Sequence, residues 1–241
     1  MPRVRLDLQY DGTDYAGWQR QNNAPSIQGE IESKLSQLCG SAIEIIGCGR
    51  TDAGVHARAY TAHADLPDQH PTELAYRLNK LLPEAIAIQS LEPSADDFHA
   101  RYHCLERGYE YRIHRSKNPF LARDSWYFPY ELNMKAMNYA ASMLIGKHSF
   151  ASFCKGEIPN GNPVCDLRQA QWVETPNGLL FDIKADRFLR NMVRAIVGTL
   201  IEVGQGKIDA ESMPSLLAAA QRSEAGNSVP AQGLSLTHLV Y

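Results

Sequence analysis

Apolar residues recur along the chain with two different periods, which predicts short strands alternating with amphipathic helices. In the first half we expect strands at 4–10, 43–46, 59–66 and 85–91, and helices at about 26–39 and 71–82. Ser26 suits the N-cap position of the first helix. The apolar stripe of that helix would consist of Ile27, Ile31, Leu35 and Leu38.

The second half shows the same mixture of patterns. Alternating bulky residues predict one long strand at 101–114, and shorter strands are expected at 168–174, 179–185 and 234–240. Helical spacing predicts helices at 133–145, about 187–203 and 210–220. Pro176, Asn177 and Gly178 suit a turn between two of the strands. Frequent hairpin joins favour the α+β class, in which helices pack against a mostly antiparallel sheet.

The composition is that of an ordinary globular protein, with 241 residues of which 44% are apolar and 21% charged. This length suffices for one large domain or two small ones. The sequence has no run of about 18 uncharged apolar residues that could cross a membrane. Its first residues do not read as a signal peptide, because Asp7, Gln9 and Asp11 interrupt them. We therefore expect a cytoplasmic protein without a membrane segment.

Potential metal ligands form no convincing pattern. The five cysteines are an odd number without a Cys-x-x-Cys pair, so neither a disulfide framework nor a structural zinc site is expected. His56, His63 and His70 recur every seven residues, which could indicate a metal site. They fall in a predicted loop, strand and loop, so equal spacing does not place them on one face. We expect no metal.

The charge balance matters less than its distribution. A net charge of −3 and a pI near 6.2 argue mildly against a nucleic-acid-binding protein. Residues 98–123, however, carry six basic residues against two acids, with aromatic residues between them, and Arg187, Arg190 and Arg194 form a second basic cluster. This mixture suits phosphate contacts with base stacking, and a solvated strand face accounts for it equally well.

A glycine-rich loop with a single acid lies between two predicted strands. Residues 47–57 read Gly-Cys-Gly-Arg-Thr-Asp-Ala-Gly-Val-His-Ala. Three glycines within eight residues mark sharp bends or a close approach to a ligand. Asp52, two residues after Arg50, is a candidate nucleophile or acid–base group. A tight turn with two solvated charges is the alternative.

Four motifs in this chain resemble those of the tRNA pseudouridine synthase A family. The first runs from Tyr10 to Gln21, and the second is the loop that carries Asp52. The third joins Phe98-His99-Ala100-Arg101 to Tyr109-Glu110-Tyr111-Arg112. The fourth joins Phe188-Leu189-Arg190-Asn191-Met192-Val193-Arg194 to Val197-Gly198-Thr199-Leu200. Their order and spacing extend the resemblance over nearly the whole chain.

The resemblance implies two α/β lobes, residues 1–104 and 105–241, which share a mostly antiparallel sheet and have the active cleft between them. It also implies an isomerase that converts uridine to pseudouridine in the anticodon stem-loop of tRNA, at about positions 38 to 40, and that works as a homodimer. The reaction breaks the N1–C1′ bond, rotates the base and rejoins it through C5, so it needs neither a metal nor an organic cofactor. The sequence agrees, because it lacks a dinucleotide-binding fingerprint and a Gly-Lys-Ser/Thr phosphate loop.

The resemblance assigns catalytic roles to Asp52, Tyr109 and Arg194. Asp52 is the catalytic carboxylate, and Tyr109 would stack on the flipped uracil or help to remove the C5 proton. Tyr111, two residues further along the same strand, is expected in the core or behind the site.

Arg194 is the expected cationic partner of the acid. It falls on the predicted helix 187–203, on one face with Arg190, Val197 and Ile201. An arginine that is partly buried there needs an anion, and a bidentate carboxylate is the usual one. Pairing with Asp52 would keep that acid ionised. A salt bridge to Glu202 or Asp186 is the alternative.

The expected RNA-binding residues are Arg50, Arg58, His56, Arg101, Trp18 and Gln19. Arg50 is suited to fill the space that a flipped base leaves, because its planar group stacks on bases. His56 and Arg58 would order the loop or touch phosphate. Trp18 either faces RNA with Gln19 or is a buried structural residue. Gly108 departs from the family pattern, which has a basic or larger residue there, and this would loosen a phosphate contact without touching the chemistry.

Two other classes of function are left open by the residues. A non-catalytic RNA-binding module or RNA chaperone of the same fold would be expected to lack the acid or its partner, and this chain has both. A hydrolase that uses Asp52 as an acceptor would want a second carboxylate or metal ligands close by. Residues 47–58 contain only one acid.

Overall fold

The computed structural model describes residues 1–67 and 71–241, so His70 of the seven-residue histidine spacing lies outside the described residues. The chain divides into two compact units, Met1–Leu105 with Leu236–Tyr241, and Glu106–Ser235. The segment 236–241 therefore packs with the first unit, although it follows the second unit in sequence.

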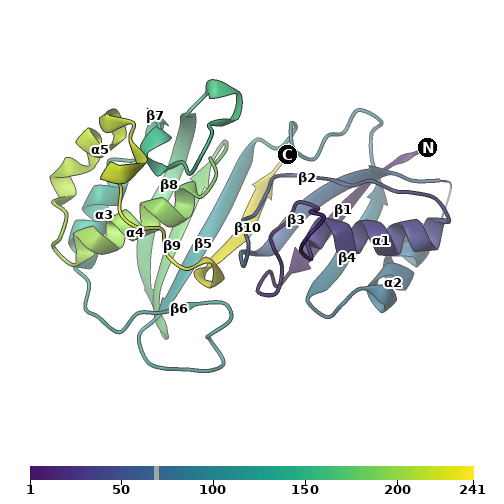
Figure 1. Ribbon diagram of the computed structural model, residues 1–241, viewed down its shortest axis with the longest axis horizontal. Helices are drawn as coiled ribbons and strands as arrows, with labels where there is room; N and C mark the ends of the chain where they lie inside the picture. The colour runs from purple at the N-terminus through teal and green to yellow at the C-terminus, as the bar shows by residue number, and fades with distance from the viewer. Residues whose placement is uncertain (68–70) are drawn as a thin grey trace. The chain divides into compact units, whose positions relative to one another are not determined.

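The first unit is built on an antiparallel sheet. β1 (Arg3–Tyr10) is paired on one side with β3 (His56–Asp65) and on the other with β4 (Ile86–Pro93). The short β2 (Ile46–Gly47) also pairs with β3, and β10 (Leu234–Val240) lies beside β3. Two helices, α1 (Ile27–Cys39) and α2 (Pro71–Leu81), contact one another and lie over the strands (Figure 1).

The local sequence explains α1. Ser26 caps its N-terminus, since the Ser26 hydroxyl accepts a hydrogen bond from the Gly29 N–H at 3.3 Å. Gly40 ends the helix in the left-handed conformation, with φ +67°, which glycine adopts without strain. Ile27, Ile31 and Leu35 are fully buried, as the helical spacing predicts. The predicted cap and these three positions of the stripe are therefore confirmed, whereas Leu38, the fourth predicted position, is only half-buried.

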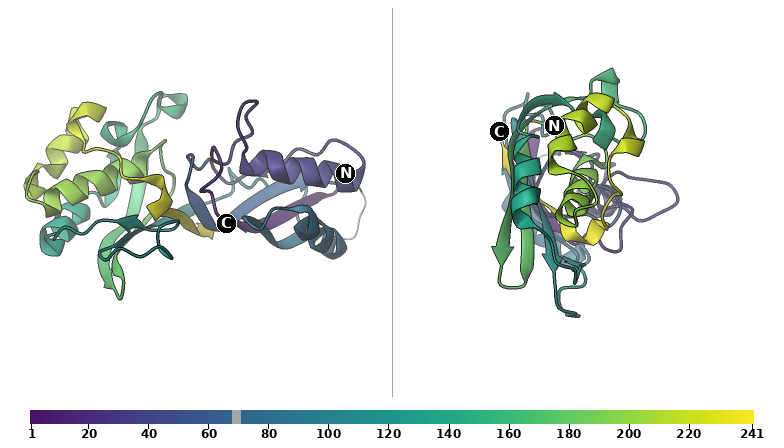
Figure 2. Two further views of the ribbon diagram at one scale, coloured as in Figure 1. Left: turned by 60° about the horizontal axis from the view of Figure 1, so that its bottom comes forward. Right: turned by 90° about the vertical axis from the view of Figure 1, so that its left-hand side faces the viewer.

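The strands of the second unit are also mostly antiparallel. The hydrogen-bonded order is β5 (Glu106–His114), β9 (Gly178–Ala185), β8 (Val164–Thr175) and β7 (Gly146–Ser149), and β6 (Trp126–Tyr127) pairs with β5 in parallel. The helices of the unit are α3 (Met134–Ser142), α4 (Met192–Gly204) and α5 (Met213–Ala219). α3 packs against both α4 and β8, and the yellow-green helices stand to one side of the green strands (Figure 2). The α+β class with mostly antiparallel strands is confirmed.

α4 is buried almost all round, and a following segment closes over it. Residues 225–229 run so close to the helix that a Cβ on Gly198 would lie 1.7 Å from the Asn227 carbonyl oxygen. The side chain of Thr199 accepts the Gly226 N–H at 2.9 Å on the same side. Glycine at position 198 thus lets the segment 225–229, which we call the strap, lie directly on the helix.

Two predicted elements begin later than expected. The helix predicted from Arg187 begins at Met192, because Asn191 adopts the left-handed conformation (φ +64°) and interrupts the helical backbone. Arg190 therefore does not share a helix face with Arg194. The strand predicted from Arg101 begins at Glu106, because the His99 ring accepts the N–H groups of Arg101 and Tyr102, both at 3.2 Å, and holds a turn.

The strand predicted at 43–46 is also shorter than expected, since β2 contains only Ile46 and Gly47. Side chains of α1 accept hydrogen bonds from the backbone N–H groups that would otherwise pair with a neighbouring strand. The Ile43 N–H donates to the Ser36 hydroxyl at 2.9 Å and the Ile45 N–H to the Glu32 carboxylate at 3.0 Å. Across the described ranges, no helix is both long and apolar enough to span a membrane.

Candidate active site

The loop that carries Asp52 links β2 to β3 and is held in a defined shape. Asp52 is half-buried in it, and its carbonyl oxygen accepts the Val55 N–H at 3.1 Å, which closes a turn. Gly54 lies inside this turn with φ +77°, a conformation that favours glycine. The sequence pattern Asp-Ala-Gly-Val therefore fixes the backbone that presents the carboxylate.

The segment 10–18 braces this loop through three hydrogen bonds. The Trp18 N–H donates to the Thr51 carbonyl and the Gly54 N–H to the Tyr15 carbonyl, both at 3.2 Å. The side-chain oxygens of Tyr10 and Thr51 lie 2.8 Å apart in the interior. The first two sequence motifs thus pack as one structural unit, in which Thr51 before Asp52 and Gly54 after it are both bonded to the segment 10–18.

Two glycines of the segment 10–18 make this approach feasible. A Cβ on Gly12 would lie 2.0 Å from the Val55 carbonyl oxygen. A Cβ on Gly17 would lie 2.4 Å from the Thr51 carbonyl oxygen, and Gly17 also has φ +95°. Any side chain at either position would push the loop away.

An aromatic pair forms the floor below the loop. Trp18 is only 2% exposed and stacks on Tyr60, with ring centroids 4.1 Å apart and planes 25° apart. The Tyr60 hydroxyl donates to the Gly49 carbonyl, and Gly47 passes so close that a Cβ there would lie 2.1 Å from the Tyr60 oxygen. Most of the Trp18 ring is thus in contact with protein.

His56 stands at the end of the loop and faces inward. It is 5% exposed, and its Nδ1 accepts the Gly12 N–H at 3.1 Å. This bond ties the first residue of β3 to the segment 10–18 and suits a residue that orders the loop. Arg50 and Arg58, in contrast, are exposed.

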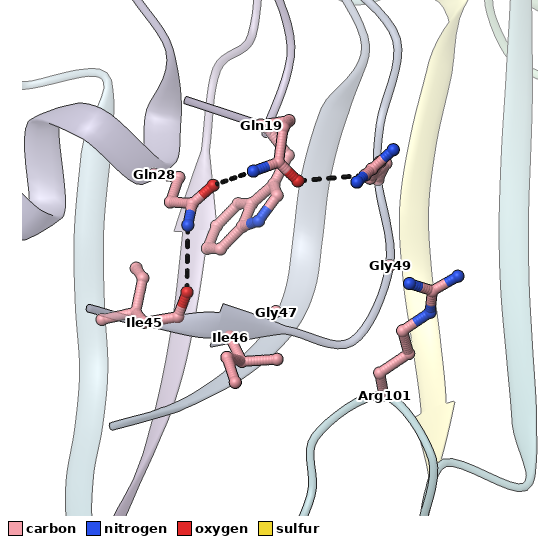
Figure 3. A pocket seen from close by; sticks show the side chains of 9 residues that line it. Gln19, Gln28, Ile45, Ile46, Gly47, Gly49 and Arg101 are labelled. Carbon is pink, nitrogen blue, oxygen red and sulfur yellow. Dashed lines mark hydrogen bonds between the residues drawn. The ribbon is translucent and has the colours of Figure 1, made fainter. Parts of the chain in front are cut away.

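A pocket of about 150 Å³ opens beside the loop within the first unit. Its walls are Trp18, Gln19, Gln28, Ile45, Ile46, Gly47, Gly49, Arg50 and Arg101. Figure 3 shows the guanidinium of Arg101 on one side and the amides of Gln19 and Gln28 on the other. Four of the six residues expected to bind RNA, Trp18, Gln19, Arg50 and Arg101, therefore line one cavity.

The turn that carries Arg101 is supported by a buried histidine. The His63 ring is 3% exposed, and its Nδ1 accepts the Ala100 N–H at 3.1 Å. Burial, helped by the nearby His99 and Arg3, lowers the pKa of His63 to about 4. The Tyr241 hydroxyl donates to the Ala100 carbonyl at 2.8 Å, so both polar backbone groups of Ala100 are held.

Tyr109 lies in the second unit, on β5. It is half-buried, and its ring meets the ring of Phe188 edge to face at 5.2 Å. Tyr111, two residues further on, is fully buried, and its hydroxyl donates to the Pro230 carbonyl at 2.8 Å. Burial raises the pKa of Tyr111 well above its usual value, and the positive charge of Arg194 offsets only part of this increase. Tyr111 is thus a core residue, as expected.

Arg194 lies on the first turns of α4 and is half-buried. Its Nε donates to the Val229 carbonyl at 2.8 Å, and the Val229 N–H donates to the Arg194 carbonyl at 3.2 Å. The strap therefore fixes the direction of the guanidinium. Of the alternative partners, the Asp186 carboxylate accepts the N–H groups of Asp166 and Arg187, at 2.8 and 2.7 Å.

Several supporting residues were not expected from the sequence. They are Gln28, Glu32, Thr51, Tyr60 and Val229. One signal was available for Glu32, a charged residue directly beside Ile31 of the apolar stripe. No group of three or more His, Cys, Asp or Glu side chains within residues 1–67 and 71–241 is arranged to hold a metal ion.

Comparison with known proteins links the whole chain to one family. A family model described as tRNA pseudouridine synthase matches residues 8–103 and 140–241. Proteins called tRNA pseudouridine synthase A are similar over the full length. The one from Syntrophotalea carbinolica is 41% identical over 245 residues, which cover 100% of this chain and 97% of the relative. The one from Porphyromonas gingivalis is 42% identical, with 100% and 98% covered, and that from Bacillus subtilis is 38% identical, with 99% of each covered.

Proposed function

Since this chain belongs to the tRNA pseudouridine synthase family, we propose that it isomerises uridine to pseudouridine within tRNA. The reaction breaks the bond between N1 and C1′ and forms one between C5 and C1′. The C5 proton leaves and N1 gains a proton, so the reaction needs no oxidant or reductant. Its requirements are an ionised carboxylate, a cationic partner for it and a site that retains the detached base.

The observation that carries this proposal is the shape of the loop around Asp52. The loop is braced by the Trp18 N–H, by Tyr15 and by the Tyr10–Thr51 contact, and glycines at 12 and 17 permit that bracing. Such a loop presents a carboxylate with little freedom to move, which is what attack on a bound nucleotide requires. We propose that Asp52 is the catalytic carboxylate.

We assign the other two catalytic roles to Tyr109 and Arg194. Arg194 would keep the acid ionised, and the Val229 carbonyl, which binds its Nε, would set the direction of the guanidinium. Tyr109 would stack on the uracil, and its edge-to-face contact with Phe188 supports the ring in one orientation. Tyr111 has no direct role in this scheme, because its hydroxyl is used by Pro230.

RNA binding is assigned to the exposed cations around the loop. Arg50, Arg58 and Arg101 are exposed and suit phosphate or base contacts. A uridine inside a stem must leave the stack before it can react, and Arg50 would fill the vacated place. His56, Trp18 and Gln19 would contribute by shaping the loop and the pocket in Figure 3.

The finer parts of the proposal rest on the family resemblance. They are action in the anticodon stem-loop at about positions 38 to 40, a homodimeric enzyme and a cytoplasmic location. A tRNA whose only uridine in the anticodon arm lies in that window would test the first of these, by mapping the product nucleotide.

The decisive experiment is tritium release from tRNA labelled at uridine C5. We expect release with the parent protein and none with Asp52→Asn, at concentrations where both bind tRNA equally. Asp96→Asn, which changes an exposed carboxylate of the same unit, is the matched control and should release tritium normally. Binding without release from the parent would favour the alternative, a non-catalytic RNA-binding module. Release from Asp52→Asn would show that another group is the nucleophile.

A further inference from the structure

A chain of hydrogen bonds leads from the interior of the first unit to the side chain of Arg50. The Arg50 Nε donates to the Gln19 amide oxygen at 3.0 Å, and the Gln19 amide nitrogen donates to the Gln28 amide oxygen at 2.8 Å. The Gln28 amide nitrogen donates in turn to the Glu32 carboxylate at 2.9 Å. It also donates to the Ile45 carbonyl at 3.0 Å, and Figure 3 shows this bond. Each link uses one donor and one acceptor.

The inner end of this chain is a buried carboxylate. The Glu32 side chain is 5% exposed and accepts hydrogen bonds from the Ile45 N–H at 3.0 Å and from the Arg20 guanidinium at 2.9 Å, besides that from Gln28. A buried carboxylate is stable only with partners of this kind, so its place is well defined. Glu32 is therefore a fixed acceptor.

That acceptor decides which way the Gln28 amide points. Its nitrogen must face Glu32 and the Ile45 carbonyl, because an oxygen there would meet two acceptors. Its oxygen then faces outward, where it accepts the Arg20 N–H at 3.0 Å and the Gln19 amide. With both ends engaged, the Gln28 amide has one favourable orientation.

The same reasoning passes to Gln19. Because Gln28 presents an oxygen, Gln19 must turn its nitrogen inward and its oxygen toward the Arg50 Nε. A flipped amide would place two oxygens together at one end and two donors together at the other. The direction of the whole chain is thus set by Glu32, and its outer end is an acceptor that holds an otherwise exposed arginine.

We propose that Gln28 is a positioning residue for RNA modification, which acts through Gln19 to hold Arg50 in the orientation that replaces the flipped uridine. The inference rests on the proposed function, in which Arg50 contacts RNA. Without Gln28, the Gln19 amide loses its fixed direction, and the Arg50 side chain regains the rotamer freedom of a long exposed residue. We then expect base flipping to become less favourable, while the chemical step at Asp52 is unchanged.

A double-mutant cycle tests this. We expect Gln28→Leu to lower kcat/KM for tritium release about tenfold in the parent background, the effect of one lost bond to a charged group. In an Arg50→Ala background the same change should have no further effect, because nothing remains to be positioned. Gln37→Leu, the same substitution at an exposed site on α1, is the control and should leave both backgrounds unchanged.

A rescue variant separates positioning from a merely structural role. In Gln28→Leu, replacing Gln19 with Glu supplies a carboxylate that is an acceptor in either orientation, so Gln19→Glu should restore most of the lost kcat/KM. A stem-loop with 2-aminopurine next to the target uridine reports flipping directly, and its fluorescence change should fall and recover with the same variants. If Gln28→Leu folds poorly, Gln19→Leu takes its place in the test. It interrupts the same chain of hydrogen bonds outside the core and should lower kcat/KM to a similar extent.

Two results would overturn the inference. If Gln28→Leu lowers kcat/KM equally in the parent and in the Arg50→Ala background, Gln28 acts by another route than through Arg50. Failure of Gln19→Glu to restore kcat/KM in Gln28→Leu would lead to the same conclusion. If Arg50→Ala is fully active while Asp52→Asn is not, the inference falls and the catalytic proposal stands. Loss of tritium release from the parent itself would instead remove the proposed function.

Discussion

The side-chain oxygens of Tyr10 and Thr51 lie 2.8 Å apart in the interior of the first unit. This contact joins the last residue of β1 to the residue that immediately precedes Asp52. Since Tyr10 is 4% and Thr51 is 7% exposed, water cannot easily replace either partner. The position of the candidate catalytic acid thus depends on β1, which lies between β3 and β4.

Replacing Tyr10 with Phe should lower the free energy of unfolding by about 1 to 2 kcal/mol, because the Thr51 hydroxyl loses a buried partner. Urea denaturation of Tyr10→Phe, Thr51→Val and the double variant measures the coupling between the two groups. The double variant should be less destabilised than the sum of the two singles. If the losses in unfolding free energy of the two single variants simply add up in the double variant, the contact does not contribute to stability.

Gly17→Ala should destabilise the protein by about 1 to 3 kcal/mol and lower activity with it, because the new Cβ would press on the Thr51 carbonyl from a backbone with φ +95°. Gly49→Ala is the matched control for stability. Apart from its two neighbours in the chain, no atom of the described residues would lie within 4 Å of its Cβ, so thermal unfolding should change little. Similar losses in the melting temperature for both variants would show that the loop adapts to a side chain at position 17.

Arg194→Lys should reduce the single-turnover rate at least about tenfold while tRNA affinity stays the same. Lysine keeps the charge but has no Nε to bind the Val229 carbonyl and no planar fork to hold a carboxylate. Arg168→Lys, at an exposed ion pair with Glu106, is the control and should retain full activity. A fully active Arg194→Lys would show that only the positive charge at this position matters.

The stability of the protein should fall as the pH drops from about 6.5 toward 4, partly because of His63. Its pKa is lowered to about 4 in the folded state, so between these values the unfolded chain binds a proton at this site that the folded chain does not. His63→Gln can retain an acceptor for the Ala100 N–H and does not titrate. Its unfolding free energy should therefore depend less on pH in this window, by up to about 2 to 3 kcal/mol across it. Parallel pH curves for the two proteins would contradict this assignment.

Local patterns were sufficient for elements that depend on neighbouring residues. Ser26 and the stripe of Ile27, Ile31 and Leu35 define α1 by capping and spacing alone. The start of α4 could not be found in this way. Phe188 and Leu189 continue the apolar pattern, and only the left-handed backbone of Asn191 separates them from the helix. The turn at 98–103 was missed for a similar reason, since the acceptor that holds it is the ring of His99.

The candidate site shows the same limit. The acid loop was recognisable because its glycines and its single carboxylate lie together in sequence. Gln28 and Glu32 are far from the loop in sequence, and their side chains are linked to it through Ile45 and Gln19. Their importance depends on the direction of hydrogen bonds in the folded chain, which no spacing rule describes. Trp18 was ambiguous from sequence, and stacking on Tyr60 places it mainly inside.

The packing of residues 236–241 with the first unit has a consequence for protein synthesis. The ribosome releases residues 1–105 long before this segment, so the nascent first unit cannot complete its sheet at β3 while the second unit is being made. The bonds from Leu105 N–H to the Val240 carbonyl and from Tyr241 to Ala100 also form only afterwards. During that interval the part of β3 that later pairs with β10 presents an open edge that could pair with other chains. Yield of the folded protein should thus depend on translation speed and on chaperones that shield this edge.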